Sequence, residues 1–142
     1  EVEISFNPKI PNSKKPAIQS SKDAESLFRM FFGISNPFLK EEAAVLFLNR
    51  ANKVIGAYHV SSGGITGTVI DIRIILGVAL KSLACAIVIA HLHPSGNLKP
   101  STADIALTTK LREASSLMDI TLLDHLILTT EGYCSLADDG II

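Results

Sequence analysis

Three scarcities in this sequence of 142 residues bear on the class of protein. It has only two cysteines, too few for a disulfide framework. Its formal net charge is −1, which argues against a broad nucleic-acid clamp but leaves a local basic patch open. Its longest apolar run, around Ala84 to Ala90, is far too short to span a membrane. We therefore expect a protein whose fold does not depend on disulfide bonds and which is not embedded in a bilayer.

The cysteines and the N-terminus bear on the compartment. Cys85 and Cys134 lie inside apolar runs typical of strands, and we expect both thiols to be buried. No signal-peptide pattern is recognisable, so a reducing cytoplasm is favoured. Because the first residue is not methionine, the sequence is also compatible with an excerpt of a longer protein.

The length and a hydrophobic content of 47% predict one domain with one core. The segment from Asn7 to Lys15 holds two prolines and three lysines, which is typical of an extended, solvated segment. We therefore predict an extended N-terminal arm over residues 1–20, with a short strand over residues 1–6. The single domain is predicted over residues 21–142.

Helical and strand-like patterns alternate along the rest of the chain, which predicts an α/β fold. Residues 43–49 and 54–60 form a predicted hairpin, and the short apolar run 85–91 is predicted as a central strand. Helices are predicted over 22–32, 69–83 and 102–117, and further strands over 120–123, 126–129 and 133–136. The segment SSGGITGT, residues 61–68, lacks the Gly-Lys-Ser/Thr ending of a phosphate loop. We expect a loop bordering a substrate groove, or a plain connector.

The stretch AHLHPSGNLKPSTAD, residues 90–104, concentrates residues that can do chemistry. On a strand, His91 and His93 point to the same face, while Leu92 points the other way into the core. Pro94 helps to end the strand. A helix is expected to begin at Ser101, with Asp104 in its first turn, where the positive helix end favours a carboxylate.

Two histidines and one carboxylate are three ligands of the kind that a catalytic zinc ion uses, with water in the fourth position. Each part has a plainer explanation on its own. Ser101 and Asp104 also fit a capping box, and a single histidine is more often structural. Only the joint pattern of His91, His93 and Asp104 favours a zinc site.

Such a hydrolase also needs a base that is not a ligand. Glu42, at the start of a strand expected in the same sheet as His91, is our first candidate. Glu41 is the alternative, because a shift of one residue exchanges the two faces of a strand. The hydroxyl of Ser101 can accept a helix N–H and still donate to an oxyanion.

The segment HLHPSGNLKPSTAD resembles the JAMM motif of JAB/MPN metalloproteases, and the surrounding sequence resembles the RadC-like branch. The resemblance extends over about residues 41–142 and is carried by residues 44–49, 86–96 and 122–138. It implies a three-layer α-β-α sandwich with a mixed sheet, related to the cytidine-deaminase fold. The Pro-Cys-x-x-Cys signature of the deaminases is absent, so deamination is not implied.

The resemblance also assigns roles to residues. His91, His93 and Asp104 would bind zinc, Ser101 would stabilise a tetrahedral intermediate, and Glu42 would act as general acid/base. The implied activity is that of a zinc-dependent peptidase or isopeptidase acting on a peptide or protein substrate. The alternatives are a DNA-repair-associated accessory module without peptidase activity, or a catalytically idle metal-binding scaffold. The sequence does not define the substrate or the oligomeric state.

The sequence departs from the family pattern at two points, and it contains one further histidine in a matched segment. Leu92 stands where RadC-like proteins commonly have asparagine, and no helix-hairpin-helix region is recognisable, so DNA binding through such a region is not implied. His125 lies in the matched segment LDHLI. It could support the metal site or contact substrate, or it could simply be a polar residue between strands.

Overall fold

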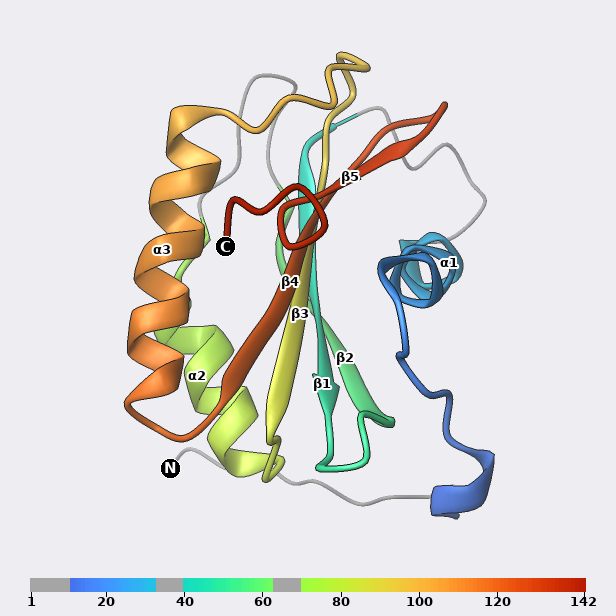
Figure 1. Ribbon diagram of the computed structural model, residues 1–142, viewed down its shortest axis with the longest axis vertical. Coiled ribbons are helices and arrows are strands. Elements are labelled where there is room, and N and C mark those ends of the chain that lie inside the picture. Colours follow the sequence, from blue (N-terminus) through green and yellow to red (C-terminus); the bar gives the residue numbers. More distant parts are fainter. Residues whose placement is uncertain (1–10, 33–39, 63–69) are drawn as a thin grey trace.

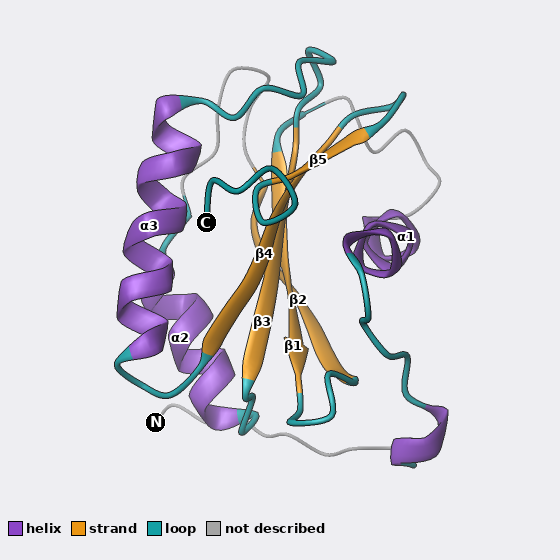
Figure 2. Ribbon diagram, viewed as in Figure 1, coloured by secondary structure: helices purple, strands orange, loops and turns teal. Residues whose placement is uncertain are grey.

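The computed structural model describes residues 11–32, 40–62 and 70–142. Its elements form three layers, with a sheet between two helices on one face and one helix on the other (Figures 1 and 2). The predicted strand over residues 1–6 and most of the segment 61–68 lie outside the described residues. Within the described part, no helix is long and apolar enough to cross a membrane.

The sheet is mixed, and its five strands follow the order β2-β1-β3-β4-β5. Only the central pair β3 and β4 is parallel, and the other neighbours are antiparallel. The strands are β1 (Glu42–Leu48), β2 (Val54–Ser62), β3 (Ala86–Leu92), β4 (Thr121–Leu128) and β5 (Tyr133–Ser135). The predicted hairpin, the central strand and the α/β class are thereby confirmed.

Three α-helices are present in the described part of the chain: α1 (Ser21–Phe32), α2 (Ile72–Lys81) and α3 (Thr102–Ser116). They agree with the three predicted helices to within a few residues. In Figure 1, α2 and α3 cover one face of the sheet and α1 covers the other. This arrangement confirms the three-layer α-β-α architecture.

The two faces of the central strands explain why β1 and β3 are apolar throughout. Alternate residues such as Leu46 and Val88 pack under α1. Their neighbours such as Val45 and Ile89 pack under α2 and α3. A strand covered on both faces needs a continuous apolar run rather than an alternating one. Leu92 is fully buried in the cluster under α1, as expected, so the departure from the family pattern lies on the face away from His91.

The region 120–129 differs from the prediction of two separate strands, because β4 is continuous. A β-bulge accommodates the polar pair in its middle. Ile87 of β3 lies opposite Leu122, whereas Val88 lies opposite Asp124, so Leu123 is the extra residue. The bulge reverses the alternation. His125 consequently faces α2 and α3, and Asp124 faces α1.

Part of the predicted arm is attached to the domain. Ile18 is buried in the cluster under α1. Its backbone N–H donates to the carbonyl of Asn52, and the N–H of Val54 donates to the carbonyl of Pro16. Residues 16–18 therefore pack beside the turn between β1 and β2. The domain boundary at residue 20 stays a prediction.

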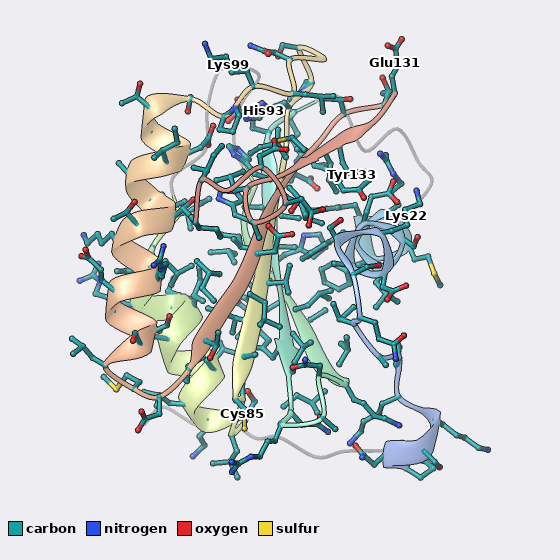
Figure 3. All side chains as sticks on the ribbon, in the orientation of Figure 1. Lys22, Cys85, His93, Lys99, Glu131 and Tyr133 are labelled. Carbon is teal, nitrogen blue, oxygen red and sulfur yellow. The ribbon has the colours of Figure 1, made fainter. Side chains whose placement is uncertain are left out.

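The expectation that both cysteines are buried was wrong. Cys85 is exposed and Cys134 is partly exposed. Cys85 precedes β3, in the connection from α2, and Figure 3 shows it at the opposite end of the sheet from His93. An apolar neighbourhood in the sequence predicted burial, but the side chain lies just before the covered part of the strand.

We expect the two thiols to react at very different rates with iodoacetamide at about pH 8, because the thiolate is the nucleophile. Burial and a hydrogen bond to Asp139 raise the pKa of Cys134 to about 12. Its thiolate fraction is then on the order of 10⁻⁴. Mass spectrometry of the folded protein should find the label first on Cys85. Equal labelling of both residues, with urea-unfolded protein as the reference, would contradict this expectation.

Candidate metal centre

The two motif histidines lie where β3 ends, on the face covered by α2 and α3. His91 pairs with Ala43 of β1, and its side chain follows those of Ile87 and Ile89 on that face. His93 comes directly after β3, where its backbone N–H donates to the carbonyl of Leu128 at 2.8 Å. The two imidazole rings have their centroids 4.9 Å apart.

The first turn of α3 brings the carboxylate to these rings. Ser101 is the N-cap, and a complete capping box joins it to Asp104. The N–H of Asp104 donates to Ser101 Oγ at 3.1 Å, and the N–H of Ser101 donates to Asp104 Oδ2 at 2.7 Å. The Ser101 hydroxyl also donates to Oδ2, at 2.6 Å. The capping explanation for these two residues therefore holds, together with their proximity to the histidines.

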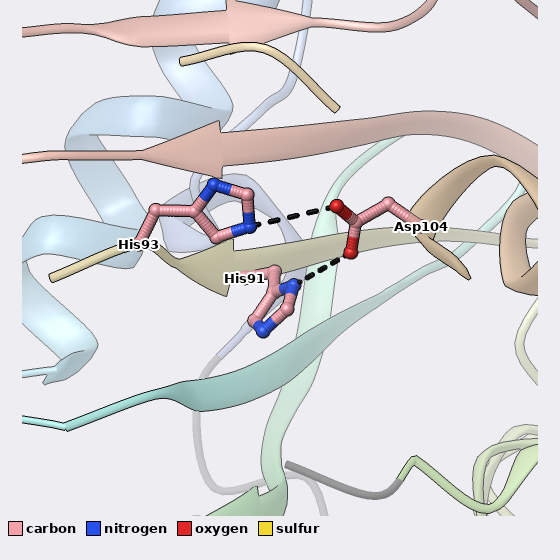
Figure 4. Close-up of side chains that lie close together, drawn as sticks. All are labelled: His91, His93 and Asp104. Atoms are coloured by element: carbon pink, nitrogen blue, oxygen red, sulfur yellow. Dashed lines mark hydrogen bonds and ion pairs between the residues drawn. The ribbon is translucent and has the colours of Figure 1, made fainter. Parts of the chain in front are cut away.

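Asp104 contacts both histidines (Figure 4). Its Oδ1 lies 3.0 Å from Nδ1 of His91, and its Oδ2 lies 3.5 Å from Nε2 of His93. One ligand atom from each of the three residues lies within 4.8 Å of the other two, so the group could hold a metal ion. Two imidazoles and a carboxylate also form a donor set that zinc accepts.

The surroundings of His93 fit the same role. Its Nδ1 lies 2.8 Å from the carbonyl of Asn97, so Nδ1 carries the proton and donates it. This bond leaves Nε2, the nitrogen nearer to Asp104, available as a ligand when the ring is neutral. A ligand histidine in a metalloprotein is commonly oriented in this way by a carbonyl on its other nitrogen.

The hydrogen bonds in the cluster set its charges. Burial disfavours the ionised form of Asp104, yet the bonds from His91, His93 and Ser101 outweigh it and hold the pKa of this carboxyl far below its usual range. The hydrogen bond with Asp104 raises the pKa of His93, against the effect of partial burial. The carboxylate of Asp104 therefore stays ionised and offers a negative charge to a cation.

The structure brings Glu41, and not Glu42, to the cluster. Oε2 of Glu41 lies 3.2 Å from Nε2 of His91. Because Ala43 lies opposite His91, the residue two positions earlier shares its face, and Glu42 points to the other side of the sheet. Glu42 instead lies 3.8 Å from the amine of Lys40. Our first candidate for the base, Glu42, thus points away from the His-His-Asp group, and the alternative, Glu41, lies beside it.

A pocket of about 670 Å³ opens at the cluster and contains Glu41 as well as the three possible ligands. The loop between β3 and α3 forms one part of its wall with polar residues. Apolar side chains just before α2 and in the first two turns of α3 form another part. The remaining lining residues are Ile70, Ser95, Asn97, Lys99, Pro100, Ser101, Thr102, Ala103 and Leu107. The cluster is therefore open to a ligand much larger than water.

Two further residues lie behind the cluster. His125 is fully buried, and its ring centroid lies 6.5 Å from that of His91. Burial lowers the pKa of His125 to about 3, so this imidazole is neutral. Thr108 lies between His125 and the first turn of α3. The sequence left the role of His125 open and did not single out Thr108. The spacing of Thr108 from Asp104, about one helical turn, is the signal that could have found it.

A largely buried His-His-Asp cluster at the end of a central strand, open to a pocket, fits a metal-binding hydrolase. A family model for the RadC-like JAB domain matches residues 18–141, and the chain belongs to this family.

Curated relatives agree with this assignment. A UPF0758 protein of Flavobacterium johnsoniae is 42% identical over 128 residues, which cover 90% of this chain and 55% of the relative. A UPF0758 protein of Porphyromonas gingivalis is 38% identical over 135 residues, which cover 94% and 60%. This chain therefore spans a little more than half the length of these two relatives.

Proposed function

We propose that this domain is a zinc-dependent hydrolase that cleaves peptide or isopeptide bonds. The observation that carries the proposal is the combination of three possible ligands with a separate carboxylate. Glu41 lies beside His91 in the same pocket but outside the His-His-Asp group. A metal-dependent hydrolase needs some residues that bind the metal and a separate residue that acts as the base.

In this proposal His91, His93 and Asp104 hold the zinc ion. When bound, zinc supplies a Lewis acid that polarises a carbonyl and lowers the pKa of water to about 7. The ionised carboxylate of Asp104 offsets the charge of the cation. The bond from His93 to the Asn97 carbonyl keeps that ring in a fixed orientation.

Glu41 is the general acid/base of the proposed reaction. Its carboxylate accepts a proton from the attacking water and returns it to the leaving amine, which departs as a neutral group. Ser101 has a different role. Its hydroxyl donates to Asp104 in the resting structure, and we expect it to turn towards the developing oxyanion when substrate is bound.

The substrate of this hydrolase is a peptide or protein segment that enters the pocket next to Glu41. The exposed loop with Ser95, Asn97 and Lys99 supplies polar groups that can bind a polypeptide backbone. A cytoplasmic location agrees with the two cysteines, which are free in the structure. The DNA-associated alternative has less support, because the net charge is −1.

The test is a comparison of metal-free and zinc-loaded protein. We expect about one zinc ion per chain by elemental analysis, and hydrolysis of peptide or isopeptide-linked substrates only by the loaded form. A chelator should abolish the activity, and added zinc should restore it. Failure to retain zinc under replete conditions would refute the metal site. Zinc retention without hydrolysis across a broad substrate panel would favour the idle scaffold.

A further inference from the structure

His125 is a buried polar residue that the proposed reaction does not use. Its side chain has no exposure, although a histidine in a core is unfavourable unless both ring nitrogens find partners. Among the described residues, Nε2 of His125 is the only buried side-chain nitrogen or oxygen without a hydrogen-bond partner. An unpaired buried atom is destabilising, so packing alone would be better served by an apolar ring.

The other ring nitrogen makes a short hydrogen bond whose direction can be deduced. Oγ1 of Thr108 lies 2.6 Å from the carbonyl oxygen of Asp104 and 2.6 Å from Nδ1 of His125. A carbonyl can only accept, and the hydroxyl has one proton, which therefore goes to Asp104. Nδ1 of the neutral imidazole must then donate to Thr108. The result is a directed chain from His125 through Thr108 to the backbone of Asp104.

The same imidazole also faces the ligand on the strand. The rings of His91 and His125 are nearly parallel, with an interplanar angle of 28°. His91 belongs to β3 and Asp104 to α3, so no single element fixes the distance between them. The ring of His125, from β4, stacks beside the ring of His91. Its Nδ1 is linked to the backbone of Asp104 through the hydroxyl of Thr108. The β-bulge at Leu123 places it there, since without this extra residue position 125 would face α1.

We propose that His125 is a positioning residue, which sets the distance between His91 and Asp104 through its ring and its hydrogen bond to Thr108. The inference rests on the proposed binding of metal by these two residues and His93. It goes beyond that proposal because it assigns a supporting role to two residues, His125 and Thr108, that are not ligands. Loss of such support typically weakens metal binding about 10–100-fold.

The experiment measures zinc affinity by competition with a chromophoric chelator and the visible spectrum of the cobalt-loaded protein. Thr108→Val removes the hydroxyl but keeps the shape of the side chain. His125→Phe keeps a ring but removes the donor. Thr109→Val is the matched control, because Thr109 is the next residue of α3 and is exposed. Chemical unfolding of each metal-free variant measures stability separately.

We expect Thr108→Val and His125→Phe each to weaken zinc binding about 10–100-fold and to shift the cobalt spectrum. Thr109→Val should match the native protein in both. The double variant should lose little more than either single variant, because the two residues act in one chain. His125→Asn, whose amide N–H can replace the Nδ1 donor, should recover part of the affinity.

The outcomes separate this inference from the proposed function. If the native protein binds no zinc, the proposed metal site fails, and this inference fails with it. If the native protein binds zinc and the variants match it in affinity and cobalt spectrum, only the positioning role is overturned. The same conclusion follows if the variants lose stability alone, because a purely structural residue would behave in that way.

Discussion

Replacing Glu41 by glutamine is expected to lower the rate of hydrolysis by about 10²–10⁴-fold, the usual contribution of a general acid/base. Glutamine keeps the size of the side chain but cannot accept the proton. Since Glu41 is outside the ligand group, zinc content should stay near that of the native protein. The measurement is kcat on a cleaved substrate, with elemental analysis of the same sample.

Glu42→Gln is the matched control for this variant. The two residues are adjacent, yet only Glu41 lies in the pocket, whereas Glu42 pairs with Lys40. Activity within a few-fold of native is expected for Glu42→Gln. If Glu42→Gln were the inactive variant and Glu41→Gln the active one, the register of β1 against β3 in the working enzyme would differ from the one described.

Asp104→Ala is expected to remove metal binding almost entirely, by more than about 100-fold in affinity, because a ligand is lost and not only its support. The two histidines would remain, but the site would lose the carboxylate whose negative charge offsets that of a cation. Hydrolysis should fall with the metal content. Isothermal titration of the metal-free variant with zinc measures the effect directly.

The control for Asp104→Ala must also remove an aspartate from a helix start, because Asp104 completes the capping box of α3. Asp23 has this position in α1, where its carboxylate accepts the N–H of Gln19 and its own N–H faces Ser20 Oγ. Both variants lose a carboxylate that accepts a backbone N–H at a helix start, so both should lose some stability. Only Asp104→Ala should lose zinc. Loss of zinc in both variants would show that the effect comes from unfolding.

The sequence was sufficient to predict that His91, His93 and Asp104 lie together, because the geometry that joins them is local. His91 and His93 share a face through the period of a strand, and Asp104 returns to them through one loop and one helical turn. Local sequence could not decide whether Glu41 or Glu42 faces the histidines. That choice depends on Ala43 lying opposite His91, a pairing between strands that are separated in the sequence by β2 and α2.

The break predicted between residues 123 and 126 failed for a similar reason. Asp124 and His125 interrupt an apolar run, which is typical of a turn between strands. In the fold both side chains form hydrogen bonds with residues that are distant in the sequence. Asp124 accepts from the Ser135 hydroxyl and the Ala137 N–H, and His125 is hydrogen-bonded to Thr108. Tertiary hydrogen bonds therefore allow a polar pair inside a buried strand, and single-sequence patterns do not contain those partners.

The capping box at the start of α3 changes how relatives of this domain should be judged for activity. Asp104 has two roles, because it completes the capping box of α3 and lies beside both histidines. A relative without hydrolytic activity would still gain helix stability from an aspartate at this position. Glu41 starts no helix, and within residues 11–32, 40–62 and 70–142 its hydrogen bond is to His91. If Glu41 is the general acid/base as proposed, the glutamate before β1 is a better marker of hydrolytic activity among relatives than Asp104.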